Sequence, residues 1–216
     1  MGLTTALFDL DGTLINSEAR SLVVWAMLLD NHGVAHDETV LRGFMGRRGP
    51  DVLREVMPGY DTHALLAEIN SYVTLPGLPE VEIVPGAVEF VRSVADSGAP
   101  TALVTSARRW WAEDRLRWLG VYDLVQTIVT AEDVTAGKPD PEAYLTAADR
   151  LGVPPAECVV FEDSLAGIAA ARAAGMTCVG LATTHHPREL AHADLVVADL
   201  TGVEWPITGG LDRPRR

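Results

Sequence analysis

Four carboxylates, one lysine and two hydroxyls follow short apolar runs of the chain. They are Asp9, Asp11, Glu162, Asp163, Lys138, Thr105 and Ser106. Carboxylates that lie close together repel unless a cation is present, so a divalent metal ion is their natural complement. Oxygen ligands without histidine or cysteine favour Mg²⁺ over zinc. Because Mg²⁺ completes its shell with water and anionic substrate, a lysine and a hydroxyl beside it suit the remaining oxygens of a phosphoryl group.

Lys138 is the only lysine of the chain, and its other permanently charged basic side chains are all arginines. A lone lysine therefore suggests a chemical role. Each residue taken alone has an ordinary alternative. Asp9 and Asp11 suit a turn, Thr105 and Asp163 suit helix caps, and Lys138 suits a solvated loop. These ordinary explanations are independent of one another. Together they do not explain why all of these residues come directly after predicted strands.

The elements that position these residues alternate between strand and helix. Near-continuous apolar runs predict strands at 4–8, 100–104, 126–129, 158–161, 177–181 and 194–197, and helical spacing predicts helices around 86–97, 107–119, 140–151, 164–174 and 187–191. This order predicts an α/β fold with a doubly wound, mostly parallel, Rossmann-like sheet. Since ligands bind at the carboxyl ends of such strands, the residues above are expected to meet at one edge.

Residues 16–82 interrupt this alternation. Helical spacing at 18–31 and 61–74, with no buried strand between them, predicts a helical cap inserted after the first strand. The predicted domains are a catalytic core of residues 1–15 and 83–205 and a cap of residues 16–82. Residues 206–216 are expected to form a loose C-terminal tail.

Four short segments resemble, in order, the motifs of the haloacid dehalogenase-like hydrolases. Residues 8–14 read FDLDGTL, 104–106 read VTS, 137–139 read GKP, and 161–164 read FEDS followed by AGIAAA at 166–171. The resemblance covers the chain apart from its tail. The cap and residues 14–18 and 84–87 are similar to the branch of small phosphosugar phosphatases and β-phosphoglucomutases. Residues 84–183 are especially similar to glycerol-phosphate and deoxyglucose-phosphate phosphatases.

The resemblance implies a role for each residue. Asp9 would be the nucleophile that forms an aspartyl-phosphate, and Asp11 would be the acid and base. Thr105, Ser106 and Lys138 would bind the substrate phosphate. Mg²⁺ would be held by Asp9, the main-chain carbonyl of Asp11 and Asp163, with Glu162 a ligand directly or through water.

Two further features carry weaker predictions. Arg47 and Arg48 lie between glycines in the cap, where they are expected to contact the substrate beyond its phosphate, although a solvated loop is an equal alternative. Trp111 and Trp118 flank Ala112, Leu116 and Leu119 at helical spacing, which favours a core position over a partner interface.

The composition of the chain limits which partners and which cellular location are expected for the protein. The formal net charge is −13, and an acidic protein repels nucleic acid and anionic lipid. No stretch has the length of a membrane span, the N-terminus lacks a signal-peptide pattern, and two cysteines suit a reducing compartment. We expect a cytoplasmic protein, monomeric or weakly dimeric, that acts on a small phosphorylated metabolite and binds neither nucleic acid nor membrane.

The predicted function is a Mg²⁺-dependent phosphomonoesterase for a sugar or polyol phosphate. The alternative is a phosphosugar mutase of the β-phosphoglucomutase type. Relatives of that type often carry a Ser-Lys pair after the second motif, where this chain has Ala107 and Arg108. A non-catalytic phosphometabolite-binding regulator is a third possibility, although a binder needs neither a nucleophile nor an acid. Dehalogenases need no metal and lack the second aspartate.

Overall fold

A six-stranded parallel sheet forms the centre of the computed structural model, which describes residues 2–207. The strands lie in the order β5-β4-β1-β6-β7-β8. Their bounds are β1 Thr5–Phe8, β4 Thr101–Val104, β5 Thr127–Val129, β6 Cys158–Glu162, β7 Thr177–Leu181 and β8 Leu195–Val197. Because β1 lies between β4 and β6, the residues that follow these three strands are neighbours at one edge. The predicted α/β fold is confirmed.

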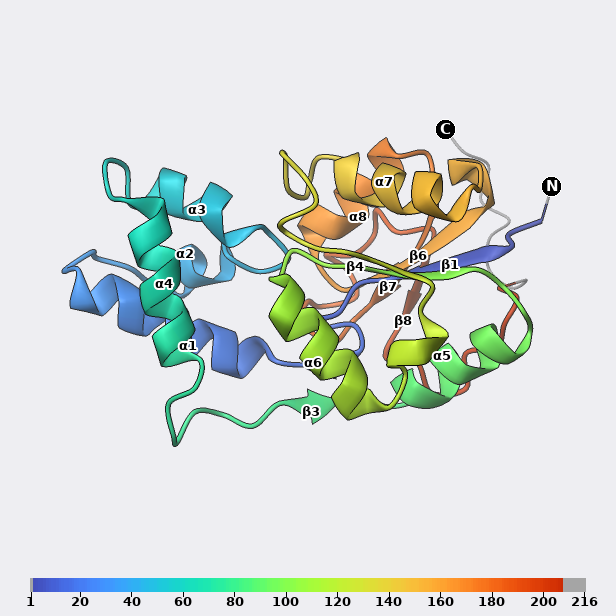
Figure 1. Ribbon diagram of the computed structural model, residues 1–216, viewed down its shortest axis with the longest axis horizontal. Coiled ribbons are helices and arrows are strands. Elements are labelled where there is room, and N and C mark those ends of the chain that lie inside the picture. The colour runs from blue at the N-terminus through green and yellow to red at the C-terminus, as the bar shows by residue number, and fades with distance from the viewer. Residues whose placement is uncertain (1, 208–216) are drawn as a thin grey trace.

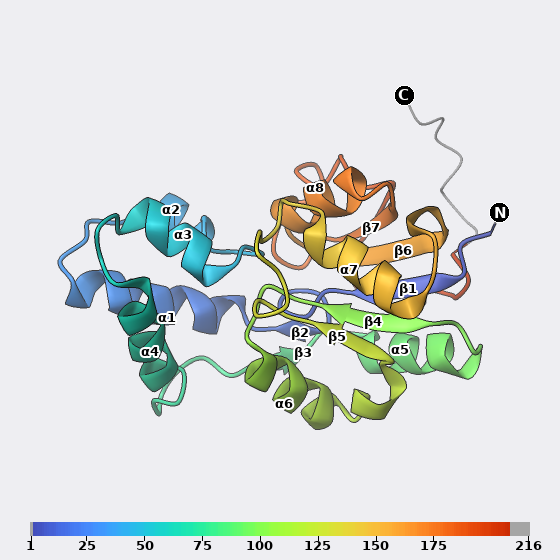
Figure 2. The same ribbon diagram turned by 45° about the horizontal axis from the view of Figure 1, so that its top comes forward.

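Helices cover both faces of the sheet, with α5 and α6 on one face and α7 and α8 on the other (Figure 2). They are α5 Ala87–Asp96, α6 Arg109–Leu119, α7 Glu142–Leu151 and α8 Leu165–Ala173, with short 3₁₀ turns at Tyr122–Leu124 and Pro155–Glu157. Alternate strand residues enter opposite cores. In β1, Phe8 packs with Phe90 and Phe161, whereas Leu7 packs in the core of α7 and α8. Burial on both faces explains the continuous apolar runs.

Four helices between the short antiparallel strands β2 and β3 lie beside the core (Figure 1). Their bounds are α1 Glu18–Asn31, α2 Glu38–Arg42, α3 Gly49–Val56 and α4 Thr62–Tyr72, while β2 is Ile15–Asn16 and β3 is Glu82–Ile83. These cap helices bury their own cluster, which includes Leu28, Leu53 and Leu65. Because the four helices share an apolar cluster of their own, they pack together as one unit next to the strand ends.

The structure corrects parts of the prediction. The prediction of a helix at 187–191 is wrong, because this segment forms turns that connect β7 to β8. The cap contains two helices, α2 and α3, that the spacing did not predict. Trp118 is 47% exposed, so its core assignment is wrong, whereas Ala112, Leu116 and Leu119 are buried as expected.

The structure describes only part of the segment that is expected to form a C-terminal tail. Of the expected tail, the structure describes Pro206 and Ile207, and residues 208–216 lie outside the described residues. Ile207 is buried against the core. Within residues 2–207, no helix is long and apolar enough to cross a membrane.

Candidate active site

The loop after β1 brings two carboxylates to the edge of the sheet. Asp9 follows the last residue of β1 and is buried, and Asp11 lies two residues further on. Gly12 has a φ of 88°, and a Cβ at this position would lie 2.1 Å from Oδ2 of Asp163. Glycine is therefore required here, both for the backbone conformation and for the close approach of Asp163.

Three buried carboxylates form a cluster with the geometry of a metal site. One oxygen each from Asp9, Glu162 and Asp163 can be chosen so that all lie within 4.8 Å of one another. Burial raises the pKa of Asp9 well above its usual range, and burial with repulsion from Glu162 raises the pKa of Asp163 to about 8. Their charged forms need a compensating cation. This all-oxygen donor set fits Mg²⁺.

Lys138 supplies one positive charge within this cluster. Its Nζ donates to Asp9 Oδ1 at 2.6 Å, to Glu162 Oε1 at 2.5 Å and to the Val104 carbonyl at 3.1 Å. Burial alone would lower the pKa of Lys138, but attraction to Asp9 and Glu162 raises it above its usual range. The lone lysine is thus a buried cation that orients the Asp9 carboxylate.

Glu162 is engaged by protein donors at both carboxylate oxygens. Oε1 accepts from Lys138 and from the Tyr144 hydroxyl at 3.0 Å, and Oε2 accepts from the amide and hydroxyl of Ser164 at 2.9 Å each. Gly167 leaves room for this carboxylate at the start of α8, because a Cβ there would lie 1.7 Å from Oε1. These bonds hold Glu162 as the partner of Lys138.

Asp11 has a different environment from Asp9. Its Oδ1 accepts from Ser17 Oγ at 2.6 Å and from Trp111 Nε1 at 3.1 Å. Burial raises the pKa of Asp11, while these two hydrogen bonds oppose the rise. The two carboxyl groups therefore differ in their partners, because Asp9 is bound by the ammonium group of Lys138, whereas Asp11 is bound by two neutral donors.

The predicted phosphate-binding hydroxyls follow β4. Thr105 is buried and its Oγ1 accepts from the Ala107 amide at 3.0 Å. Ser106 Oγ donates to the Gly46 carbonyl of the cap at 2.9 Å. Thr105 therefore lies beside the cluster at the strand edge, whereas Ser106 connects the core to the cap.

A cavity of about 310 Å³ lies between the cap and the core, above Asp9 and Asp11. Its lining includes Trp25, Phe44 and Met45 from the cap and Trp110, Trp111 and Thr105 from the core. Because aromatic and aliphatic side chains line much of the wall above a charged floor, the cavity suits a phosphate ester whose organic part has an apolar face.

The two cap arginines have separate positions. Arg47 lines the cavity and pairs with Glu55 through two bonds of 2.5 and 3.0 Å. Arg48 instead donates to the main-chain carbonyls of Ala131, Val134 and Thr135 at 3.3, 2.6 and 2.8 Å. Arg48 therefore fastens the cap to the core loop that precedes Lys138.

Several partners of the site residues were missed from the sequence. Asp163 accepts from Thr13 at 3.1 Å and from Thr184 at 2.5 Å. Thr184 follows β7 and lies at the same sheet edge, so the strand-end rule could have found it. Trp111 and Tyr144 reach the site from helices α6 and α7, and nothing in their spacing indicates this.

The comparisons agree with this geometry. The model of the family described as haloacid dehalogenase-like hydrolase matches residues 6–181. This chain is a haloacid dehalogenase-like hydrolase. The matched range contains all seven residues predicted to form the site at the strand ends.

Two characterised relatives of this hydrolase are phosphatases. It is 45% identical over 207 residues to "Validoxylamine A 7'-phosphate phosphatase" of Streptomyces hygroscopicus subsp. limoneus, covering 94% of this chain and 97% of the relative. It is 34% identical to "Hexitol phosphatase A" of Escherichia coli, covering 90% of each chain. Among solved structures, a hydrolase from Pseudomonas syringae superimposes with a TM-score of 0.83 at 29% identity, covering 91% and 94%.

Proposed function

We propose that this phosphatase hydrolyses the phosphate ester of a small sugar or polyol through a covalent intermediate on Asp9. The observation that carries the proposal is the differentiation of two carboxylates on one loop. Asp9 is bound to the buried Lys138 at 2.6 Å, whereas Asp11 is held by the neutral donors Ser17 and Trp111. A nucleophile and an acid of raised pKa are the pair that two-step ester cleavage requires.

In the first step, a carboxylate oxygen of Asp9 attacks phosphorus and the bond to the leaving oxygen breaks. Asp11 gives its proton to that oxygen, so the product leaves as an alcohol. Lys138 and Thr105 hold the oxygens of the transferring phosphoryl group, and Lys138 screens Asp9 from the incoming negative charge.

In the second step, Asp11 takes a proton from water, which attacks phosphorus and releases inorganic phosphate from Asp9. Because Asp11 begins ionised in this step, it returns to its protonated form at the end of the cycle. The same side chain therefore serves both half-reactions, and its hydrogen bonds with Ser17 and Trp111 hold it in place for each.

The residues proposed to hold Mg²⁺ are Asp9, Asp163 and the main-chain carbonyl of Asp11. When bound, Mg²⁺ supplies positive charge that offsets the phosphate dianion and the clustered carboxylates. Glu162 is proposed to act through Lys138, or on Mg²⁺ through water, because both of its oxygens already accept hydrogen bonds.

The alternative of a phosphosugar mutase is less supported. A mutase holds a second phosphate while the first is transferred, which requires a free cation near the cavity. Arg108 lines the cavity, but its Nε donates to Glu132 at 3.3 Å, and Arg47 is paired with Glu55. Arg20, the third arginine of the lining, donates to the carbonyls of Val73 and Pro79. Hydrolysis is therefore the function that we propose.

The proposed setting is the cytoplasm, with a small phosphorylated metabolite as partner and a monomer or weak homodimer as the assembly. Cys158 and Cys178 are both free thiols in buried strands, which accords with a reducing compartment.

The test is phosphate release from a panel of esters by purified protein, with Mg²⁺ and with excess EDTA. The panel contains hexitol phosphates, validoxylamine A 7'-phosphate and p-nitrophenyl phosphate. We expect turnover that EDTA stops and Mg²⁺ restores, and we expect Asp9→Asn to be inactive while it keeps the wild-type circular dichroism spectrum. Turnover by the Asp9→Asn variant, or turnover that survives chelation, would refute the proposed chemistry.

A further inference from the structure

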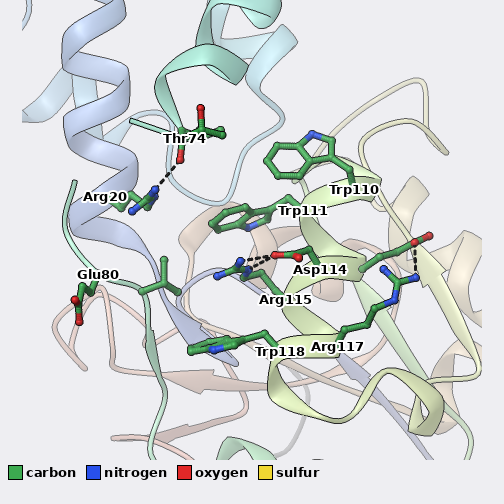
Figure 3. A pocket seen from close by; sticks show the side chains of 12 residues that line it. Arg20, Thr74, Glu80, Trp110, Trp111, Asp114, Arg115, Arg117 and Trp118 are labelled. Carbon is green, nitrogen blue, oxygen red and sulfur yellow. Dashed lines mark hydrogen bonds and ion pairs between the residues drawn. The ribbon is translucent and has the colours of Figure 1, made fainter. Parts of the chain in front are cut away.

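A second, open cavity of about 800 Å³ lies along α6, beside the segment of residues 73–81 that returns from the cap to the core (Figure 3). Its lining includes Trp110, Trp111, Arg115 and Trp118 on α6, with Arg20 and Glu80 opposite them. We refer to it as the tryptophan groove. None of the catalytic roles above uses this groove apart from Trp111.

The floor of the groove is a stack of flat groups. Trp111, Arg115 and Trp118 are four and three residues apart, so they share one face of α6. The guanidinium carbon of Arg115 lies 4.6 Å from the ring centre of Trp111 and 5.4 Å from that of Trp118. Asp114 pairs with Arg115 and fixes it between the two rings (Figure 3). The result is a preorganised Trp–Arg–Trp stack.

This surface faces solvent although its rings are apolar. Trp110 and Trp118 are 45% and 47% exposed, while the opposite side of α6 buries Ala112 and Leu116 in the core. Large aromatic groups kept at a concave surface are typical of ligand sites, because they bury much area at a low cost in conformational entropy.

The groove adjoins the catalytic cavity. Both are lined by Arg20, Val73, Trp110 and Trp111. Trp111 is the common wall, since its N–H binds Asp11 while its ring contacts Arg115. If Asp11 protonates the leaving oxygen, as proposed above, the leaving group begins beside Trp111, the residue on which the groove borders.

The charges of the groove indicate what kind of group it binds. Arg115 is paired with Asp114 and Arg117 with Glu113 at 2.9 Å, and Arg20 donates to the carbonyls of Val73 and Pro79. The lining holds three arginines and three acids, the latter being Glu80, Glu113 and Asp114, so the groove carries no net positive charge to attract a second phosphate. These side chains offer donors and acceptors to hydroxyl groups beside the tryptophan rings, which favours a neutral polyhydroxylated ring.

We propose that the tryptophan groove is a subsite for a second sugar-like ring of the leaving group, and this inference rests on the proposed phosphatase function. Trp118 lies two helical turns from Trp111, about 10 Å along the axis, which is beyond the reach of a single ring held next to Asp11. The preferred substrates are therefore phosphate esters of two linked rings, with the distal ring stacked on Trp118.

The test compares trehalose 6-phosphate with glucose 6-phosphate, which differ only in the second ring, and uses p-nitrophenyl phosphate as a reference. The wild type is expected to have the higher kcat/KM for the two-ring ester. Trp118→Leu should lower the ratio of kcat/KM for the two-ring ester to that for the one-ring ester by about 3- to 10-fold, the effect of losing one aromatic stacking contact. Trp118→Tyr, which keeps an aromatic face, should restore most of this ratio.

Tyr60→Ala is the matched control, because Tyr60 is an exposed aromatic residue of the cap outside both cavities. It should leave the ratio unchanged. An equal ratio in wild type and Trp118→Leu overturns the subsite, even when both sugar phosphates are hydrolysed. Hydrolysis of the aryl ester but of neither sugar phosphate overturns the proposed substrate class and the subsite together. A dimer in sedimentation analysis that Trp118→Leu dissociates, with no change in the ratio, makes the groove an interface between copies.

Discussion

Trp111 and Asp11 are joined by a hydrogen bond of 3.1 Å, from the indole N–H of α6 to Oδ1 of the carboxyl group. Ser17 donates to the same oxygen at 2.6 Å. With Oδ1 accepting two bonds, the proton that Asp11 transfers is expected on Oδ2. A helix that covers the sheet thus positions Asp11, the proposed acid, on the loop after β1.

Trp111→Phe should slow alkyl phosphates more than aryl phosphates. The phenyl ring keeps contact with Arg115 but cannot donate to Asp11, so the acid is held by Ser17 alone. We expect kcat for a sugar phosphate to fall about tenfold, a part of the 10²–10⁴ that acid–base assistance contributes. Nitrophenolate leaves without a proton, so p-nitrophenyl phosphate should change less. Equal losses on both substrates would show that Trp111 does not act through Asp11.

Asp11→Ala should separate the two half-reactions. A sugar alkoxide needs a proton to leave, whereas nitrophenolate does not, so only the aryl ester should phosphorylate Asp9. The next step needs Asp11 as base and should be slowed by roughly 10²–10⁴-fold. Rapid mixing should then give a burst of about one nitrophenolate per active site and a slow steady state. Steady turnover near the wild-type rate would exclude Asp11 as the base.

Asp163→Asn should change the response of thermal stability to Mg²⁺. In the wild type, Mg²⁺ at 100 times its Kd should add about 2.7 kcal/mol to the free energy of unfolding. This corresponds to roughly 5–10 °C in melting temperature for a chain of this size. The variant should lose most of this increase. In EDTA it should melt at or above the wild-type temperature, because burial and Glu162 disfavour the Asp163 charge. Asp96→Asn, at an exposed acid, is the control, and an undiminished Mg²⁺ shift in Asp163→Asn would remove Asp163 from the metal site.

Arg48→Ala should reduce turnover of all substrates by a similar factor. Its guanidinium donates to three carbonyls of residues 131–135, so its loss weakens the attachment of the cap to the core. Loss of about 1.5 kcal/mol of charge-assisted bonding corresponds to roughly tenfold in kcat/KM. Arg54→Ala is the control, because Arg54 lies in α3, which begins one residue after Arg48, and its exposed side chain pairs with Asp51 of the cap. An effect confined to sugar phosphates would instead indicate that Arg48 contacts the substrate.

Asp133→Asn should destabilise the fold in a pH-dependent manner. Burial alone would raise the pKa of Asp133, but hydrogen bonds from Arg150 and Thr130 and the charge of Arg109 lower it to about 2. A carboxylate with a lowered pKa stabilises the fold above its unfolded pKa of about 3.9, and this stabilisation is lost as pH falls towards 2. Urea unfolding should show a loss of about 1–2 kcal/mol at pH 7, which shrinks between pH 4 and pH 2. A loss that stays constant over this range would contradict the assignment.

The sequence by itself predicted a parallel sheet and the residues at its carboxyl edge, whereas the order of the strands comes from the structure. Strands buried on both faces require continuous apolar runs, and the residues after β1, β4 and β6 must meet because parallel strands end at the same edge. The single lysine could be singled out for a chemical role because all other such charges are arginine, whereas its burial between Asp9 and Glu162 comes from the structure.

The tertiary structure alone decided which side chains surround these residues. Trp111 reaches Asp11 across 100 positions, and Tyr144 reaches Glu162 from the opposite face of the sheet. Such contacts depend on how a helix is rotated and placed against the sheet, which the local apolar spacing does not specify. Trp118 has the same spacing as a core residue, yet the position of the return segment 73–81 leaves it in an open groove. Spacing therefore defined the face of α6 that packs on the sheet, and only packing decided what its other face would contact.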